Sequence, residues 1–334
     1  SGFCNVNGLF ETAFEISGGI ETITGPASSR YGANAMHGVI NVISKPVTNN
    51  NSVSTNIGPN GYKNFKNWVN SGPFKCISSK RNERLLKTLT RLSIENLMHP
   101  FQTFILGQKN IVPSIALKYD IPLIFYGENE SEYGNPLDNN SNPFMDLDYF
   151  SIDDPLKIKF AGISLKEIIN KTKFNFSDFN IYIPPKTTEI INKKIKVSYL
   201  GYFEKWDPQE CYYYSVDNTG FRPSYERSIG TYSRYTEIDD KIVPFHFYTT
   251  YIKYGIGRAS YDAAQEIRNG KITRDEGIEL VKKFDGEFPN RYFKNFIDYI
   301  NIDEDTFFKI IDKFRSPHLW RKNQGEWILR RSIY

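Results

Sequence analysis

Cysteine is scarce and long apolar runs are missing, and these two absences exclude several classes of protein. The three cysteines among 334 residues, Cys4, Cys76 and Cys211, lie far apart and form no CxxC pair. This spacing argues against a disulfide framework and a thiolate zinc site, and it fits a reducing cytoplasm. No stretch approaches the roughly 20 apolar residues that span a bilayer, and the N-terminus lacks a charged-then-apolar signal pattern. We therefore expect a cytoplasmic protein with no membrane segment.

An excess of one charge is also lacking. The 42 Lys and Arg residues stand against 38 Asp and Glu residues, so the formal net charge is +4, and the charges are interspersed along the chain. Without a basic arm or patch, nucleic acid is not an expected partner. Aromatic residues are abundant, with 22 Tyr and 25 Phe, and most of these side chains are expected in a core or at its edge.

Composition divides the chain into three parts. Residues 1–50 are rich in Gly and Asn, and the chain passes through an Asn-rich linker near residue 50. Residues 51–258 are predicted to form an α/β body that carries a polar insertion at 137–192. Residues 259–334 are predicted to form a helical C-terminal region.

Helical periodicity is clearest in four segments of the first half and of the insertion. Leucines recur at helical spacing over residues 82–98, and a second long helix is expected over 104–119, interrupted by Pro113. Shorter helices are predicted for residues 62–70 and 164–171.

The C-terminal region contains explicit start and stop signals for helices. Residues 260–270 favour a helix that ends at Gly270, because glycine adopts the backbone conformation that follows a helix. Thr273 and Glu276 form a capping box for the next helix. Acidic residues at 303–305 begin the last helix and basic residues end it, which complements the helix dipole.

Two apolar runs predict a parallel sheet. Residues 121–126, IPLIFY, read as a strand buried on both faces, and residues 196–203 read as a second strand. A helix, a buried strand and then a polar loop that starts at Gly127 are typical of a doubly wound α/β sheet. Ligands bind at the carboxyl ends of the strands in such sheets, so this loop is the first candidate site.

The first polar cluster joins residues 99–109 to the loop that starts at Gly127. Glu128 and the other carboxylates of this loop could hold Mg²⁺ on a triphosphate or act as a general base. His99 and Gln102 precede the helix that runs antiparallel to the strand, so we expect them nearer to the loop than Lys109. A solvated acidic loop and a helix-end histidine are the alternative interpretations.

Two further clusters combine arginine with tyrosine. Residues 217–241 contain three arginines among three tyrosines, and residues 245–262 add His246, Lys253 and Arg258. Arginine forks bind phosphate or carboxylate, and tyrosine stacks on rings or hydrogen-bonds to hydroxyls. The composition suits a nucleotide-activated acidic sugar, and a structural salt-bridge network would have the same composition.

Four long blocks resemble the N-acetyl sugar amidotransferase family over roughly residues 56–320. They are HPFQTFILGQKNIVPSIALKYDIPLIFYGENESEYGN, TGFRPSYERSIGTYSRYTEIDDKI, FHFYTTYIKYGIGRASYDAAQEIRNGKITRDEGIELVKKFDGEFP and RSPHLW. The resemblance implies an adenine-nucleotide α-hydrolase-like fold. It also implies that ATP activates the acetamido oxygen of a sugar and that ammonia from a partner glutaminase yields an acetamidino group. Such products enter O-antigen or flagellar-type glycans.

The N-terminal part departs from that family. Its members carry an SGGxDS phosphate loop at a strand-to-helix junction, and the nearest candidate is Ser17, Gly18 and Gly19, with Glu21 for Asp and Thr22 for Ser. Glycines and a proline follow where a helix should begin. From this degenerate loop we expect impaired catalysis.

Residues 19–47 instead resemble the plug segment of TonB-dependent outer-membrane receptors, with the pattern GPxSxxYGxxAxxGVINxxxK. In the plug this segment is a strand-turn-strand element and not a ligand site. A natural fusion, a mis-assembled reading frame and a divergent phosphate loop are all consistent with this pattern.

The predicted function is therefore ATP-dependent conversion of an acetamido to an acetamidino group on a nucleotide-activated N-acetyl sugar, with a glutaminase as partner and ATP and Mg²⁺ as cofactors. A non-catalytic sugar-binding or glutaminase-docking subunit is the alternative, and a receptor fragment is a third. No metal ligand is assigned. The predicted site residues are Glu128, Asn129 and His99 for catalysis, Gly127, Glu132, Gln102, Ser17, Gly18 and Gly19 for the nucleotide, and Arg222, Arg227, Tyr232, Lys253 and Arg258 for the sugar.

Overall fold

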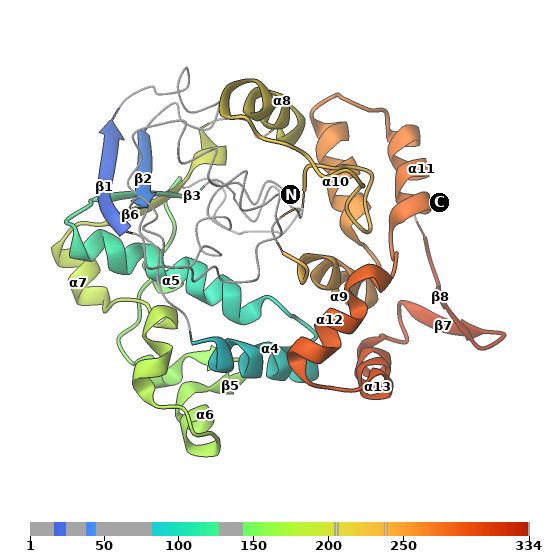
Figure 1. Ribbon diagram of the computed structural model, residues 1–334, viewed down its shortest axis with the longest axis horizontal. Helices are drawn as coiled ribbons and strands as arrows, with labels where there is room; N and C mark the ends of the chain where they lie inside the picture. The colour runs from blue at the N-terminus through green and yellow to red at the C-terminus, as the bar shows by residue number, and fades with distance from the viewer. Residues whose placement is uncertain are drawn as a thin grey trace, which may run out of the picture.

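The protein is a mixed α/β structure with a small parallel sheet and a helical C-terminal region, as predicted (Figure 1). The computed structural model describes the backbone of residues 17–24 and 38–44, and residues 82–126 and 143–332 apart from 204, 206, 237 and 239. Its strands are β1 (Ser17–Thr24), β2 (Gly38–Ser44), β3 (Leu123–Tyr126), β4 (Lys159–Phe160), β5 (Ile163–Ser164), β6 (Lys196–Tyr199), β7 (Trp320–Asn323) and β8 (Glu326–Leu329). Its α-helices are α4 (Glu83–Leu97), α5 (Gln102–Lys118), α6 (Leu165–Lys171), α7 (Thr187–Asn192), α8 (Pro208–Thr219), α9 (Val243–Tyr254), α10 (Arg258–Arg268), α11 (Arg274–Phe284), α12 (Asn290–Ile300) and α13 (Glu304–Phe314).

Strands β3 and β6 form the parallel pair. Leu123 lies opposite Lys196, and the register runs without a shift to Tyr126 opposite Tyr199. Ile124 is buried, whereas Leu123 is 37% exposed, so the prediction that the strand over 121–126 is buried on both faces is wrong at Leu123. The predicted strand over 196–203 is also too long, because the chain turns into a 3₁₀ helix after Tyr199.

Helix α5 is continuous through Pro113, contrary to the predicted interruption. A proline in a helix has no N–H for the carbonyl four residues earlier, which is that of Lys109. The hydroxyl of Tyr126 donates a hydrogen bond to this carbonyl at 3.1 Å, and it also lies 3.3 Å from the carbonyl of Gln108. The end of β3 therefore lies against the middle of α5, and the expectation that His99 and Gln102 lie nearer to it than Lys109 is wrong for the described residues.

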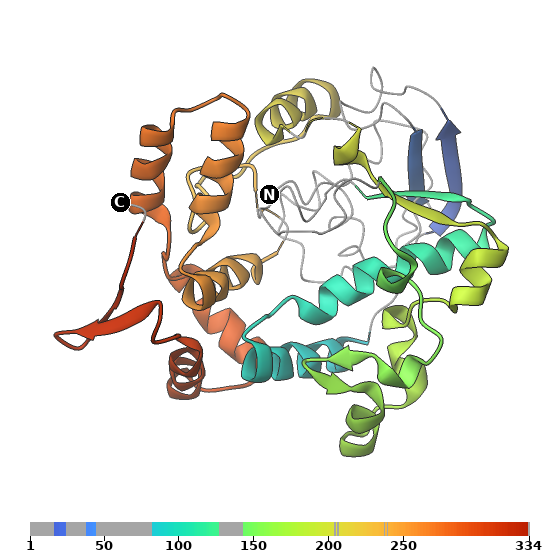
Figure 2. The same ribbon diagram turned by 180° about the vertical axis from the view of Figure 1, so that it is seen from behind.

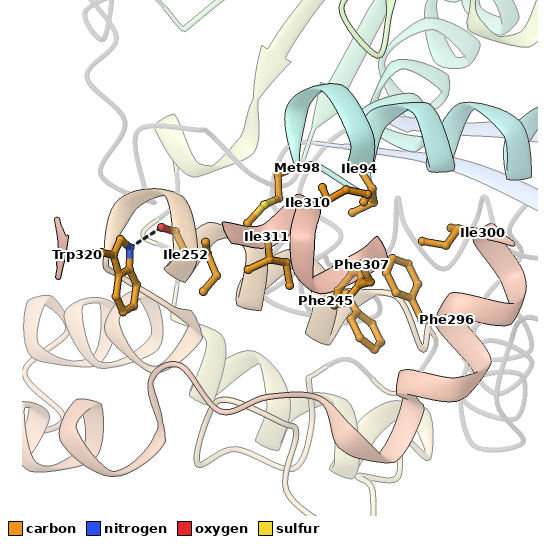
Figure 3. Close-up of a cluster of buried hydrophobic side chains, with 10 residues drawn as sticks. All are labelled: Ile94, Met98, Phe245, Ile252, Phe296, Ile300, Phe307, Ile310, Ile311 and Trp320. Carbon is orange, nitrogen blue, oxygen red and sulfur yellow. Dashed lines mark hydrogen bonds between the residues drawn. The ribbon is translucent and has the colours of Figure 1, made fainter. Parts of the chain in front are cut away.

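The largest hydrophobic cluster joins α4 to the C-terminal helices (Figure 3). Ile94 and Met98 at the end of α4 pack with Phe245 and Ile252 of α9 and with apolar side chains of α12 and α13. Phe245 stacks on Phe296 of α12 with ring centroids 4.1 Å apart. The leucine periodicity predicted α4 correctly: Asn82 caps its start, and Met98 follows its end with a left-handed backbone.

The cap residues of three C-terminal helices lie where the sequence signals predicted, but the last segment of the chain is not helical. Thr273 and Glu276 form the capping box of α11, Gly270 follows α10 with a φ of +71°, and Asp303 caps α13. The chain then leaves the helices in the β7–β8 hairpin, which the sequence analysis did not predict and which extends at the edge of the molecule (Figure 2).

Strands β1 and β2 pair antiparallel, with a register shift between Ser17 and Gly19. This pairing is the arrangement expected for the strand-turn-strand element, and the resemblance to a plug segment stays a prediction. The helix predicted over residues 62–70 lies outside the described residues.

Candidate functional site

A buried arginine organises the first part of the candidate site. Arg258 is the first residue of α10 and is 1% exposed. Its Nε lies 2.9 Å from Oδ1 of Asp262, one helical turn away, and its guanidinium lies 4.3 Å from the ring centroid of Phe247. Burial lowers the pKa of Arg258 and Asp262 raises it, so the carboxylate offsets part of the cost of burying this charge.

Asp262 also holds the irregular segment 228–236, which we call the tyrosine loop. The hydroxyl of Thr231 donates a hydrogen bond to Oδ2 of Asp262 at 2.6 Å. The backbone N–H of Ala259 donates to the carbonyl of Gly230 at 3.0 Å. The first turn of α10 therefore fixes the loop that carries Tyr232 and Tyr235.

The two tyrosines meet acidic side chains of neighbouring elements. Burial and the charge of Glu266 raise the pKa of both Tyr232 and Tyr235, and Asp262 adds to the effect. Burial and Asp262 raise the pKa of Glu266, whereas the Tyr232 hydroxyl lowers it. Asp207 caps α8 and forms an ion pair with Lys271 at 3.2 Å. We call this group the acidic-tyrosine cluster: Asp207, Tyr232, Tyr235, Asp262 and Glu266.

Arg227 holds the other side of the tyrosine loop. Its two terminal nitrogens bind the two carboxylate oxygens of Glu287 at 2.7 Å each, and its guanidinium lies 4.7 Å from the ring centroid of Phe284. Glu287 also accepts the backbone N–H of Gly230 at 2.7 Å. The hydrogen bond with Glu287 raises the pKa of Arg227 and lowers that of Glu287. This bidentate pair braces the backbone of the loop.

Three basic side chains make up the second part of the candidate site. His99 follows α4, and its ring centroid lies 5.0 Å from that of His246 on α9. Lys253, two turns further along α9, donates a hydrogen bond to the carbonyl of Leu97 at 3.2 Å. Burial, followed by the charge of Lys253, lowers the pKa of His99 to about 4, and burial, followed by His99 and Lys253, lowers that of His246 to about 3. We call His99, His246 and Lys253 the basic cluster.

Phe247 connects the basic cluster to Arg258. Its ring centroid lies 5.1 Å from that of His246, and the guanidinium of Arg258 lies over the same ring. Side chains from five separate segments of the sequence therefore form one continuous region, from His99 through Phe247 to Glu266.

The structure brings several predicted site residues into this region. Tyr232, Arg258, His99 and Lys253 lie in it, and Arg227 braces the loop beside it. The side chain of Gln102 instead binds the β4–β5 turn: its Nε2 donates to Lys159 O at 3.2 Å, and its Oε1 accepts the N–H of Ala161 at 3.0 Å.

The other predicted residues lie elsewhere. Arg222 is exposed on the chain that follows α8. Ser17, Gly18 and Gly19 lie in strand β1, which pairs with β2. The predictions for Gly127, Glu128, Asn129 and Glu132 lie outside the described residues.

Sequence reasoning missed four contributors, Asp262, Glu266, Phe247 and Asp207, and it named His246 without assigning it a role. The spacing held one usable signal: Arg258, Asp262 and Glu266 follow one another at four-residue intervals, so they share one face of α10. No spacing relates Asp207 to α10, because the two lie on separate elements.

Comparison with known families bears on the C-terminal third of the chain. Residues 229–334 match a family model described as LPS biosynthesis protein WbpG-like, C-terminal domain. The match supports a role in surface polysaccharide biosynthesis. It covers α9 to α13, the β7–β8 hairpin and the tyrosine loop from residue 229 onward, and so it includes Tyr232, Lys253 and Arg258. A search of curated proteins found no match.

The described residues set two further bounds on the site. None of their helices is long and apolar enough to cross a membrane. Nor do they contain a group of three or more His, Cys, Asp or Glu side chains that could hold a metal ion.

Proposed function

We propose that the protein is an ATP-dependent amidotransferase that converts the acetamido group of a nucleotide-linked N-acetyl sugar into an acetamidino group during surface polysaccharide biosynthesis. One observation carries the proposal: the part of the chain that matches a polysaccharide-biosynthesis family contains Tyr232, Lys253 and Arg258, which lie in one continuous region of the fold. The specific reaction comes from the resemblance over residues 56–320.

The reaction can be written so that its atoms balance. The acetamido oxygen attacks the α-phosphorus of ATP, and the bond to pyrophosphate breaks. Ammonia then attacks the activated carbon, and the C–O bond breaks so that the oxygen leaves on AMP. The products are the acetamidino sugar, AMP and pyrophosphate. For this reaction the protein must hold the two substrates with their reacting atoms close and correctly oriented, and it takes little part in the covalent chemistry itself.

The geometry suggests a division of roles among the side chains. The acidic-tyrosine cluster presents carboxylates and phenol rings, which accept hydrogen bonds from sugar hydroxyls and stack on ring faces. Arg258 and Arg227 are committed to Asp262 and Glu287, so we assign them the positioning of the tyrosine loop instead of direct contact with the sugar. In this proposal, Tyr232 and Glu266 contact the substrate.

Mg²⁺ and ATP enter the proposal through the resemblance. Glu128 and Glu132, the carboxylates expected at the metal-nucleotide end, lie outside the described residues, and the described residues hold no metal-binding group. Mg²⁺ would neutralise phosphate charge on the nucleotide when bound.

The test is pyrophosphate release by the full chain with ATP, ammonium and a panel of nucleotide-linked N-acetyl sugars. We expect sugar-dependent release that Glu128→Ala abolishes and that Glu266→Gln lowers by at least about tenfold, the loss of one charged contact to the substrate. Glu279→Gln is the matched control, because the Glu279 side chain is 73% exposed on α11. Release that is independent of sugar, or equal losses in both Gln variants, contradicts the proposal.

One observation favours a second candidate function, a non-catalytic sugar-binding subunit that docks a glutaminase. Ser17 to Gly19 lie in a strand, whereas a phosphate loop needs a turn into a helix N-terminus. Binding of a nucleotide-linked sugar without ammonia-dependent turnover would select this alternative.

A further inference from the structure

The basic cluster buries three basic side chains beside one another, an arrangement that does not favour folding. Lys253 acts on both His99 and His246, His99 also acts on His246, and no carboxylate of the described residues is among these groups. Burial lowers the pKa of Lys253 as well. Without an acidic partner, burial and the Lys253 charge hold the two histidines neutral, and buried basic groups left in this way concentrate at functional sites.

The hydrophobic core places these groups together. Met98 ends α4 with a left-handed backbone and packs in the same cluster as Ile252 of α9, so the residues next to them, His99 and Lys253, are held close (Figure 3). The hydrogen bond from Lys253 to Leu97 fixes the end of α4 against α9.

Phe101, the N-cap of α5, packs against His246 of the basic cluster with ring centroids 5.6 Å apart. Several buried polar atoms of the cluster and of the first turn of α5 have no hydrogen-bond partner within the described residues. They include Nδ1 of His99 and Nδ1 of His246. Oγ1 of Thr103 is a third, and Thr103 is fully buried in the first turn of α5. Helix α5 also begins at Phe101 without a side-chain cap. Buried polar groups normally have partners, so this group of atoms indicates a bound molecule.

We propose that the basic cluster, together with the first turn of α5, is a phosphate-binding subsite. A phosphate group supplies several acceptor oxygens and negative charge, which suit the imidazole N–H groups, the Thr103 hydroxyl and the positive end of α5. Its charge would stabilise the buried Lys253 ammonium and lower the cost of charging the two histidines. The neutral imidazoles become protonated as the anion binds, because a nearby negative charge raises a histidine pKa.

Two sources of this phosphate fit the proposed function. The subsite itself does not rest on the proposed function; only the choice between these two sources does. One is the diphosphate of the nucleotide-linked sugar, and the other is the polyphosphate of ATP. Because Phe247 lies against both His246 and Arg258, a phosphate at the basic cluster would lie beside the acidic-tyrosine cluster. The affinities of the subsite for the two kinds of phosphate can be compared without turnover.

The experiment is an NMR titration of the histidine ring signals in the full chain. The chain has four histidines, so single His→Asn variants assign every signal, and exposed His318 serves as the internal control. Pyrophosphate, UDP and inorganic phosphate are added separately, and each is compared with NaCl at equal ionic strength.

We expect the His99 and His246 signals to shift with a Kd of about 1 mM or tighter. The pKa of His99 should rise by at least about one unit, because the anion favours the charged imidazole. The His318 signals should match those in NaCl. A tenfold tighter binding of UDP or of pyrophosphate identifies the source.

Two variants separate a binding role from a structural one. Lys253→Met should weaken binding at least about tenfold, as expected for loss of a charged contact, while Lys282→Met on exposed α11 should not. Thr103→Val keeps the side-chain volume and should weaken binding while leaving the melting temperature within a few degrees. No shift of His99 and His246 beyond the NaCl control, or equal binding by Lys253→Met, overturns the inference. Binding without sugar-dependent turnover keeps the subsite and contradicts the amidotransferase.

Discussion

The hydroxyl of Tyr126 donates a hydrogen bond to the carbonyl oxygen of Lys109 at 3.1 Å, and that carbonyl is the one that Pro113 leaves without a helical N–H. Tyr126 is the last residue of β3, so one contact both completes the hydrogen bonding of α5 and sets the helix against the sheet. Burial raises the pKa of Tyr126, so its hydroxyl stays protonated as a donor across the physiological range.

Tyr126→Phe should lower the free energy of unfolding by about 1–3 kcal/mol, because it leaves a partly buried carbonyl without a donor. In the background of Pro113→Ala, residue 113 regains its N–H and the same change should cost less. Urea unfolding of the four proteins in this double-mutant cycle measures the coupling. Equal costs in both backgrounds would show that Tyr126 does not serve this carbonyl.

Asp262→Asn should destabilise the protein by about 3–5 kcal/mol, because it removes the negative partner of the buried Arg258 guanidinium. Asp298→Asn is the control, since Asp298 pairs with Lys294 on the surface of α12, where such pairs contribute less than about 1 kcal/mol. Thermal melts of both variants test the contrast. A small effect of Asp262→Asn would mean that other groups neutralise Arg258.

Gly286→Ala should be far more harmful than Gly270→Ala, although both glycines have a positive φ, +78° and +71°. A Cβ on Gly286 would lie 2.6 Å from Cζ of Tyr251, whereas a Cβ on Gly270 meets nothing within 4 Å. We expect about 1 kcal/mol of backbone strain at Gly270 and several kcal/mol at Gly286, where packing must also shift. Melting temperatures of the two variants separate strain from overlap, and equal losses would contradict the close approach of Tyr251.

Stability should fall as the pH drops below about 6.5, in part because of His99 and His246. Their pKa values are about 4 and about 3 in the folded protein, so between these values and about 6.5 the unfolded chain binds more protons than the folded one. Each histidine then contributes a slope of up to about 1.4 kcal/mol per pH unit, which levels off below its folded pKa.

Urea unfolding between pH 7 and pH 5 measures this slope. His246→Asn should lower the slope by up to about 1.4 kcal/mol per pH unit, the contribution of one proton. The exposed control His318→Asn should leave the slope unchanged. An unchanged slope in His246→Asn would show that this imidazole is charged in the folded protein. The proposed phosphate subsite leads to a further expectation: saturating pyrophosphate should make the free energy of unfolding depend less steeply on pH.

The helices of the C-terminal region could be predicted because their signals are local. The capping box of Thr273 and Glu276 and the glycine that follows α10 act through hydrogen bonds and backbone angles within a few residues. The leucine spacing of α4 is local in the same sense. The β7–β8 hairpin carries no comparable signal, and the hydrogen bond from Trp320 Nε1 to the carbonyl of Ile252, 68 residues away, helps to hold it in place (Figure 3).

The sequence by itself determined the class of the fold, the approximate bounds of α4, α5, α6, α10, α11 and α13, and which polar segments are unusual. Only the tertiary structure decided which polar groups meet. His99 lies beside His246 and Lys253 because Met98 and Ile252 share a core, and Tyr232 lies beside Glu266 because Arg258 and Asp262 hold the tyrosine loop. Local hydrogen bonds and propensities act over a few residues and can be read along the chain. Packing joins residues more than 100 positions apart, and no local pattern encodes those partners.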